Sequence, residues 1–144
     1  MRFKIDFSGQ KFILTLRRRR RRVGCLGGSH REYLLHKSRA RQLVKTRIAE
    51  LNLLYNFSYQ KFVIRNQKSR WGSCSSRGVL NFNYKLVFLP DHLADYLIAH
   101  ELCHLKEMNH SRRFWNEVAR AIPDYPRCRR DLQLFKFADC GATV

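Results

Sequence analysis

Hydrophobic and polar residues alternate at the start of the chain, over residues 1–16. Phe3, Ile5 and Phe7 occupy every second position, and a break that contains Gly9 separates them from a second short apolar run. Period-two alternation around such a break is typical of two strands joined by a tight turn. We therefore expect a β-hairpin in this segment.

The spacing of the apolar residues changes to three and four over residues 30–56. This spacing places apolar side chains on one face of a helix, so it predicts a long amphipathic helix from His30 to Asn56. The opposite face of that helix is basic. The apolar positions are Leu34, Ala40, Leu43, Val44, Ile48, Leu51 and Leu54, and the basic ones are Lys37, Arg39, Arg41, Lys45 and Arg47.

Two apolar runs in the middle of the chain have the composition of strands. They are Phe62–Ile64 and Val79–Leu89, and a glycine-containing segment separates them. Pro90 and Asp91 then favour the start of a second helix, because proline fits the first helical turn and an acid is stabilised at the positive end of the helix dipole. The helical spacing continues as far as Leu102.

The C-terminal part of the chain predicts further helical structure. Ser111 is a candidate N-cap, and an apolar face follows it. Phe114 and Trp115 are adjacent, about 100° apart around a helix, so only one of them can face the interior fully. We expect this helix to end at Pro123 and Pro126, before a basic closing segment. Strands and helices together indicate a single α+β domain over residues 1–144.

Length and charge narrow the function classes. The chain has 144 residues, the size of one domain, and a formal net charge of +18. Residues 1–70 hold 19 basic and 3 acidic side chains, whereas residues 71–144 hold 10 and 8. This excludes an acidic solvating protein and predicts nonspecific nucleic-acid association through the run Arg17–Arg22 and the basic helix face. Such a run is also typical of a solvated arm.

The cysteines indicate a reducing compartment. There are five of them, an odd number, and no two form a C-x-x-C pair. Neither a disulfide framework nor a zinc ribbon fits this pattern, so we expect reduced thiols and a cytoplasmic protein. The apolar stretch Phe12–Leu16 is far too short to span a membrane. We therefore expect no membrane span.

One five-residue motif carries chemistry. His100-Glu101-Leu102-Cys103-His104 has the H-E-x-x-H pattern. Residues four apart lie on the same face of a helix, about 6 Å apart, so both imidazoles can bind one zinc ion. The carboxylate of Glu101 lies beside the first ligand, where it can take a proton from a zinc-activated water. The motif therefore predicts a metal-dependent hydrolase.

A catalytic zinc normally has three protein ligands and one open position. His110 is the third candidate, because it follows His104 by six residues, the spacing of the metzincin pattern. That pattern has a glycine where this chain has Glu107. We expect Asn109 to make the turn instead, since asparagine tolerates the left-handed conformation.

Other side chains near the motif are alternatives or are excluded. Glu117 is the alternative third ligand, in a thermolysin-like arrangement. His92 lies two helical turns, about 12 Å, before His100 and cannot share its ion. Cys103 points about 100° away from His104 around the helix, so we expect it to pack as a small apolar residue.

Five blocks of sequence surround and include this motif. They are Ser69–Ser76, Leu80–Asn83, His100–Leu105, Asn109–Ser111 and Phe114–Trp115. In order and spacing these blocks resemble the YgjP-like family of zinc metallopeptidases, which is similar in turn to the SprT and WLM groups of minimal zincins. The resemblance covers residues 60–126.

The resemblance implies a zincin-like α+β fold in which a small antiparallel sheet packs on the H-E-x-x-H helix. It implies that His100, His104 and His110 bind one catalytic Zn²⁺. Glu101 would be the catalytic acid/base. The substrate would be a protein or peptide lying along an edge strand, for which the strand after Gly78 is a candidate.

Within this single domain we expect a basic hairpin and arginine-rich loop at residues 1–28 and a catalytic core at residues 60–126. For Trp71–Cys74 we favour a tight turn with a core tryptophan and a buried thiol over a wall of the active-site cleft. The sequence does not identify the group that stabilises the oxyanion; Tyr125 and an arginine are candidates.

Two other functions fit parts of the sequence. The first is a basic nucleic-acid-binding protein with a structural metal site, in which Cys74 and Cys103 would complete the ligand set. The second is a zinc amidohydrolase that acts on small molecules, because the same site chemistry suits any carbonyl substrate.

Overall fold

The structure, a computed structural model, describes residues 4–7, 10–13, 26 and 28–135. The predicted hairpin is present as the antiparallel pair β1 (Lys4–Phe7) and β2 (Gln10–Ile13), in which Phe7 pairs with Gln10. The arginine run Arg17–Arg22 lies outside the described residues.

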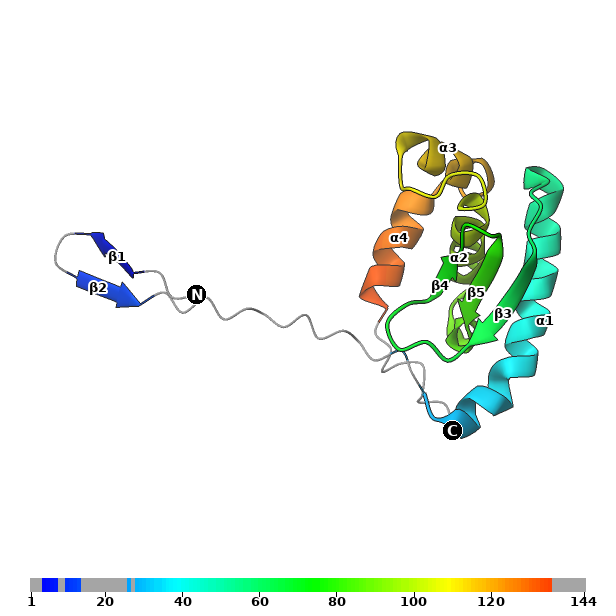
Figure 1. The fold of residues 1–144 in the computed structure, drawn as a ribbon, viewed down its shortest axis with the longest axis horizontal. Helices are drawn as coiled ribbons and strands as arrows, with labels where there is room; N and C mark the ends of the chain where they lie inside the picture. Colours follow the sequence, from blue (N-terminus) through cyan, green and yellow to red (C-terminus); the bar gives the residue numbers. More distant parts are fainter. Residues whose placement is uncertain (1–3, 8–9, 14–25, 27, 136–144) are drawn as a thin grey trace.

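The predicted long helix is α1 (His30–Tyr55), which runs along one side of the fold (Figure 1). It begins where the hydroxyl of Ser29 accepts a hydrogen bond from the backbone N–H of Glu32 at 3.1 Å. It ends at Asn56, whose φ of 52° is left-handed and whose N–H donates to the carbonyl of Asn52. Both ends are therefore capped by hydrogen bonds. The buried positions of α1 are Ala40, Val44, Ile48 and Tyr55.

Three strands form a small mixed sheet in the order β3 (Lys61–Arg65), β5 (Val79–Asn83) and β4 (Gly72–Cys74). The central strand β5 pairs in parallel with β3 and antiparallel with β4. Two expectations are therefore wrong: the sheet is not purely antiparallel, and the strand after Gly78 is not an edge. The reason is that a tight turn at residues 75–78 folds one side of β5 against β4, while β3 pairs in parallel with the other side, so β5 is central and β3 and β4 are the edges.

The strand expected over Val79–Leu89 is shorter than its apolar pattern indicates. It ends at Asn83, whose side chain accepts a hydrogen bond from the N–H of Lys85 at 3.1 Å. The chain then continues as a short 3-10 helix, η1 (Tyr84–Phe88), that is mostly buried. The pattern does not show this end, because apolar residues continue past Asn83 as Tyr84 and Leu86–Leu89, and a short apolar run fits a buried strand and a buried helix equally well.

The H-E-x-x-H motif lies at the C-terminal end of α2 (Asp91–Cys103), the most buried helix of the described chain, and His104 is its C-cap. Figure 1 shows α2 behind the sheet, with α1 on one side and α4 (Tyr125–Leu134) on the other. Helix α3 (Arg112–Ala121) also contacts α2. The core thus lies around α2, between the sheet and the other helices.

Helix α4 occupies part of the segment that we expected to close the chain after Pro126. Pro126 lies in the first turn of α4. Backbone N–H groups there have no partner within the helix, so the missing N–H of proline costs no hydrogen bond, and its φ suits a helix. Pro126 therefore lies at the start of a helix instead of ending one. Cys128 is the buried residue of α4 and packs into the core. The C-terminal helices of the fold are therefore α3 and α4.

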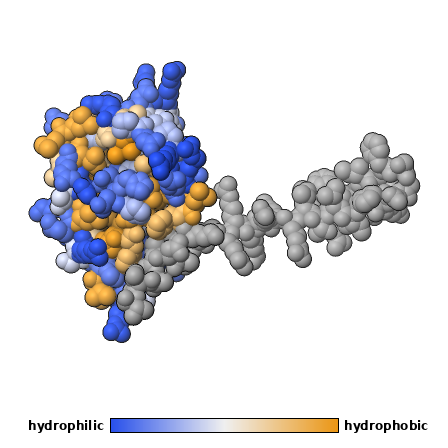
Figure 2. Space-filling view, turned by 180° about the vertical axis from the view of Figure 1, so that it is seen from behind, coloured by the Kyte–Doolittle hydropathy of each residue, from blue (hydrophilic) through white to orange (hydrophobic). Residues whose placement is uncertain are grey.

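The face of the described chain that Figure 2 shows mixes apolar and polar areas. Leu34 and Leu54, which belong to the apolar stripe of α1, are exposed near its two ends, at 56% and 46%. None of the helices in the described ranges is both long and apolar enough to cross a membrane.

Candidate metal centre

Three histidines converge at the C-terminal end of α2. The Nε2 atom of His100 lies 3.3 Å from Nε2 of His104, one helical turn further along. It lies 3.1 Å from Nε2 of His110, which comes from the loop before α3. The ligand atoms of the three side chains are all within 4.8 Å of one another. The structure thus brings together the three histidines that the sequence singled out.

This arrangement fits a zinc ion. Two nitrogen ligands at about 2.05 Å from a tetrahedral zinc are about 3.3 Å apart, which matches the two Nε2 separations. Burial, together with the neighbouring His104 and His110, lowers the pKa of His100 to about 3. Its ring is therefore neutral at physiological pH, and a neutral imidazole is the form that binds a metal.

A backbone carbonyl fixes the tautomer of His104. Its Nδ1 lies 3.0 Å from the carbonyl oxygen of Glu107. Because a carbonyl can only accept, Nδ1 carries the hydrogen, and the lone pair of Nε2 is free to point at the centre. Glu107 thus contributes through its backbone, a role that no pattern of side chains could show.

The turn between His104 and His110 differs from the expected one. Leu105, Lys106 and Glu107 donate their backbone N–H groups to carbonyls of residues 102 and 103, so the chain turns through helix-like hydrogen bonds. Asn109 does not have the left-handed conformation that we expected, since Asn56 is the only non-glycine residue with positive φ in the described part. The Asn109 side chain instead accepts a hydrogen bond from the N–H of Ser111 at 3.2 Å.

The ring of Phe114 packs beneath all three histidines. Its centroid lies 4.8, 4.5 and 4.9 Å from the ring centroids of His100, His104 and His110. Phe114 is fully buried, whereas Trp115 is half-buried and stacks on His110 at 5.7 Å. The prediction that only one of the two aromatic residues faces inward is confirmed, and Phe114 is that residue.

Glu101 presents a buried carboxylate beside the histidines. Only 5% of the residue is exposed, and no hydrogen-bond partner of its Oε2 atom is found in the described part. Burial raises its pKa to about 8, although the nearby Arg70 opposes this. A buried carboxylate without a partner is costly in a purely structural role, and it is typical of a group poised to exchange protons.

Strand β4 forms the wall opposite this carboxylate. Gly72, Ser73 and Cys74 line a pocket of about 270 Å³ together with Glu101, the three histidines and Met108. Our preference for a tight turn remote from the cleft is therefore wrong. The signal was Gly72 itself, because a glycine inside a strand often marks the close approach of another group.

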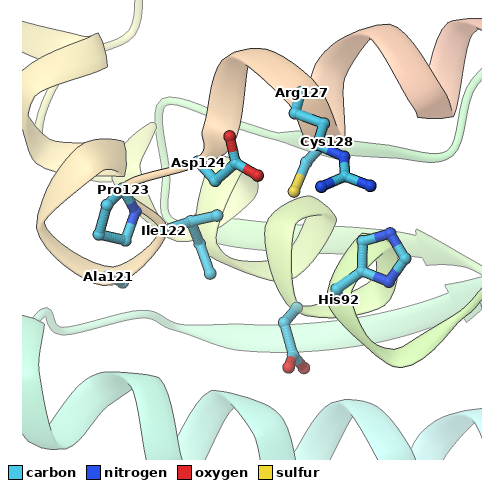
Figure 3. Close-up of a pocket in the computed structure, with 8 residues that line it drawn as sticks. His92, Ala121, Ile122, Pro123, Asp124, Arg127 and Cys128 are labelled. Atoms are coloured by element: carbon cyan, nitrogen blue, oxygen red, sulfur yellow. The ribbon is translucent and has the colours of Figure 1, made fainter.

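Glu117 and His92, which the sequence also brought into consideration, lie outside the histidine cluster. Glu117, the alternative ligand, forms ion pairs with Lys106 and Arg120 and is not in the histidine cluster. His92 lines a separate pocket of about 490 Å³ with Asp124, as the close-up shows (Figure 3).

The remaining candidates do not line the histidine pocket. Cys103 is fully buried in the core, as expected for a packed thiol. Tyr125 stacks on Trp115 at 5.1 Å, and neither Tyr125 nor any described arginine lines the histidine pocket. Neither candidate for the oxyanion partner is therefore among the residues that line this pocket.

Comparison with known proteins agrees with this geometry. The fold is similar to the crystal structure of the metallopeptidase zymogen of Pyrococcus abyssi abylysin, with a TM-score of 0.55 and 23% identity over 66% of this chain and 92% of that one. It is also similar to the metallopeptidase zymogen of Methanocaldococcus jannaschii jannalysin, with a TM-score of 0.52 and 25% identity over 66% and 94%. No curated protein shows significant sequence similarity. The family model of the YgjP-like metallopeptidase domain matches residues 30–134, and the chain is therefore a metallopeptidase of the YgjP-like family.

Proposed function

We propose that the protein is a zinc-dependent peptidase in which His100, His104 and His110 bind the metal and Glu101 is the general acid/base. The observation that carries this proposal is the convergence of three Nε2 atoms beside a buried carboxylate whose Oε2 has no hydrogen-bond partner among the described residues. Three nitrogen ligands leave one position of a tetrahedral zinc open, which is the arrangement of catalytic and not of structural sites.

The chemistry divides between the metal and the protein. Zinc bound at this site supplies Lewis acidity, which polarises the scissile carbonyl and makes water more acidic. Glu101 takes a proton from the attacking water as the new C–O bond forms. The same carboxyl group then gives that proton to the leaving nitrogen as the C–N bond breaks. Burial raises the pKa of Glu101 in the metal-free site, and a bound zinc cation would lower it again, which favours the carboxylate form that accepts the proton.

The substrate would lie along β4. This strand is the edge of the sheet next to the centre, since one of its sides pairs with β5 and the other is unpaired among the described strands. An extended peptide can add to such an edge through main-chain hydrogen bonds, which bind many sequences equally well. β4 thus replaces the strand after Gly78 as the candidate for substrate binding.

The structural-metal alternative lacks a fourth ligand among the described residues. Cys103 is fully buried in the core, and Cys74 does not belong to the group of ligand atoms that lie within 4.8 Å of one another. A structural zinc is normally closed by four protein ligands, mostly cysteines. The geometry therefore favours a catalytic site.

Digestion of denatured casein tests the proposal and separates it from amidase activity on small molecules. We expect fragments with the zinc-loaded protein, none after removal of zinc with a chelator, and fragments again when zinc is restored. Small amide substrates incubated in parallel should be hydrolysed much more slowly. Hydrolysis of small amides without any cleavage of casein would support the amidohydrolase instead.

As a second activity we propose nonspecific binding of nucleic acid through α1. Of its five predicted bases, Arg47 is held by ion pairs to Glu50 and Asp95, but the other four have no carboxylate partner in the described ranges. Those four are Lys37, Arg39, Arg41 and Lys45. Binding to single- and double-stranded DNA should weaken steeply from low to physiological salt, because phosphate contacts release counterions. A flat salt response would contradict this activity.

A further inference from the structure

A second pocket opens directly beside the metal centre. It has a volume of about 510 Å³, and His104 and Met108 line both this pocket and the one that holds Glu101. Its other walls come from the segment before β3 and from the turn between β4 and β5. We call it the recognition pocket. A substrate bound at the metal centre along β4 would extend past it.

Part of the recognition pocket is apolar. Tyr59 and Leu105 are half-buried, and Met108 is 53% exposed at the border with the metal centre. A Cβ added to Gly78 would lie 3.7 Å from Cδ2 of Leu105 and 3.8 Å from Cα of Tyr59, so Gly78 lies where these two walls meet. Such walls suit the methylene groups of a side chain longer than alanine.

The charge of the recognition pocket is positive. Arg77 lines it, is exposed, and has no ion-pair partner among the described residues. No aspartate or glutamate lines the pocket. An arginine without a carboxylate partner is a ready partner for a carboxylate from outside, because the guanidinium can donate two parallel hydrogen bonds to it.

The backbone of the turn that carries Arg77 is held in place. The N–H of Gly78 donates to the carbonyl of Ser75, and the N–H of Ser75 donates to the carbonyl of Val79. The hydroxyl of Ser75 also accepts a hydrogen bond from the N–H of Val79 at 3.1 Å. Arg77 is therefore presented to the pocket from a fixed turn, which limits the entropy lost when it binds a partner.

We propose that the recognition pocket binds an acidic side chain of the substrate, glutamate above all, next to the scissile bond, and that Arg77 determines this specificity. The methylene groups of the glutamate pack against Leu105 and Met108, and its carboxylate binds the Arg77 guanidinium. A lysine in the same position places like charges together. This inference rests on the proposed peptidase function, since it concerns the substrate of that site.

Peptide binding to a protein that cannot cleave the peptide tests this inference. The zinc-loaded Glu101→Gln protein is titrated with fluorescein-labelled decapeptides that differ at one central position, which is Glu, Gln or Lys in turn. The position is moved through the four central residues of the peptide. At the position that faces the pocket, the glutamate peptide should bind about three- to tenfold more tightly than the lysine peptide.

Variants of Arg77 and a matched control complete the test. In the Glu101→Gln background, Arg77→Met should bring the ratio of the two affinities close to one, and Arg77→Glu should invert it. Arg31→Met, which removes another exposed arginine, at the start of α1, should leave the ratio unchanged. The inference is overturned if no decapeptide binds, if no position shows a preference, or if the Arg77 variants keep it.

Cleavage by the unmutated protein separates this inference from the proposed function. The same peptides are incubated with the zinc-loaded wild-type protein and analysed by mass spectrometry. A glutamate preference in binding without any cleavage would support the recognition pocket and contradict the peptidase proposal. Cleavage without a preference that depends on Arg77 would support the peptidase and overturn the role of Arg77.

Discussion

Gly72 and Glu101 lie so close together that a Cβ added to Gly72 would be 2.7 Å from Oε1 and 2.8 Å from Cγ of Glu101. Real Cβ atoms almost never approach another heavy atom so closely. The missing side chain of one residue on β4 is thus what allows the carboxylate on α2 to occupy its buried position. The two residues belong to blocks that are far apart in the sequence, and the fold places them in contact.

Gly72→Ala should therefore impair catalysis more than stability. The added methyl group meets a flexible side chain and not backbone, so the carboxylate moves away while the fold remains. We expect kcat for peptide hydrolysis to fall by about tenfold or more, since small displacements of a catalytic group are costly. The zinc content should stay at the wild-type level. Steady-state kinetics and metal analysis of the purified variant measure both quantities.

Gly78→Ala is the control for Gly72→Ala, because it should affect stability more than catalysis. Gly78 has a φ of 75°, which alanine adopts only with strain, but a Cβ there would make ordinary contacts at 3.4 Å or more. This variant should lose about 1 to 2 kcal/mol of unfolding free energy. It should retain its kcat, because Gly78 lines the recognition pocket, where a change affects peptide affinity and hence KM, and does not line the pocket of Glu101. Equal kcat values for the two alanine variants would contradict the positioning role of Gly72.

The ligand set predicts which side chains the zinc content depends on. His110→Ala should lose most of the bound zinc, because two nitrogen ligands hold the ion much more weakly than three. Glu117→Gln should retain the zinc, since Glu117 is engaged with Lys106 and Arg120. His92→Ala is a second control from the separate pocket. Loss of zinc from Glu117→Gln but not from His110→Ala would restore Glu117 as the third ligand.

Phe114 should tune the metal affinity through packing. Phe114→Leu removes the ring that supports the three histidines, so we expect the zinc affinity to fall by about tenfold, as for other groups that orient metal ligands. Val118→Ala is the matched control, because Val118 is also fully buried and lies one turn further along α3. It should lower stability without lowering zinc affinity. Competition with a zinc chelator measures the affinities.

The raised pKa of Glu101 predicts how the zinc-free protein responds to pH. In the unfolded chain the pKa of Glu101 is its ordinary 4.5, and in the folded protein it is about 8, so only the folded state holds the proton between these values. The stability that this provides is complete below about pH 4.5 and is lost as the pH rises through about 8. Glu101→Gln has no such loss. Urea unfolding of both proteins at about pH 5 and about pH 8 measures this difference. Between these pH values the unfolding free energy of wild type should fall relative to that of the variant, by at most about 1.4 kcal/mol per pH unit.

Glu117 should make stability depend on pH in the opposite direction. Hydrogen bonds from Lys106 and Arg120 lower its pKa, so its charged form stabilises the fold above its ordinary pKa and this contribution is lost as the pH falls. Relative to Glu117→Gln, wild type should lose stability on acidification and not on a rise in pH. An identical pH response of the two glutamine variants would contradict the buried, desolvated state of Glu101.

The spacing of apolar residues and a local capping residue predicted α1 and the start of α3 correctly. The spacing of apolar residues located α1 to within one residue, and Ser111 caps α3 as expected, with its hydroxyl accepting from the N–H of Phe114. Helix geometry also explains why His100 and His104 lie together, since a four-residue spacing determines their distance. These features depend on neighbours in sequence and are therefore readable from it.

Features that depend on contacts between distant segments were not readable. Strand β4 has three residues, too few for a period, and its place at the sheet edge follows from pairing with β5. The turn after His104 is stabilised by backbone hydrogen bonds that any residue can form, so the departure from glycine at Glu107 did not require the left-handed Asn109. The approach of Gly72 to Glu101 likewise appears only when β4 and α2 are placed together.

Hydrolysis by zinc-loaded Glu101→Gln, measured beside its zinc content, tests the central claim most directly. The account predicts one zinc ion per chain in both wild type and variant, with peptide cleavage by the wild type and none by the variant. This result would assign the histidines to metal binding and Glu101 to proton transfer. Cleavage by the variant at the wild-type rate, with one zinc bound, would contradict the proposed mechanism.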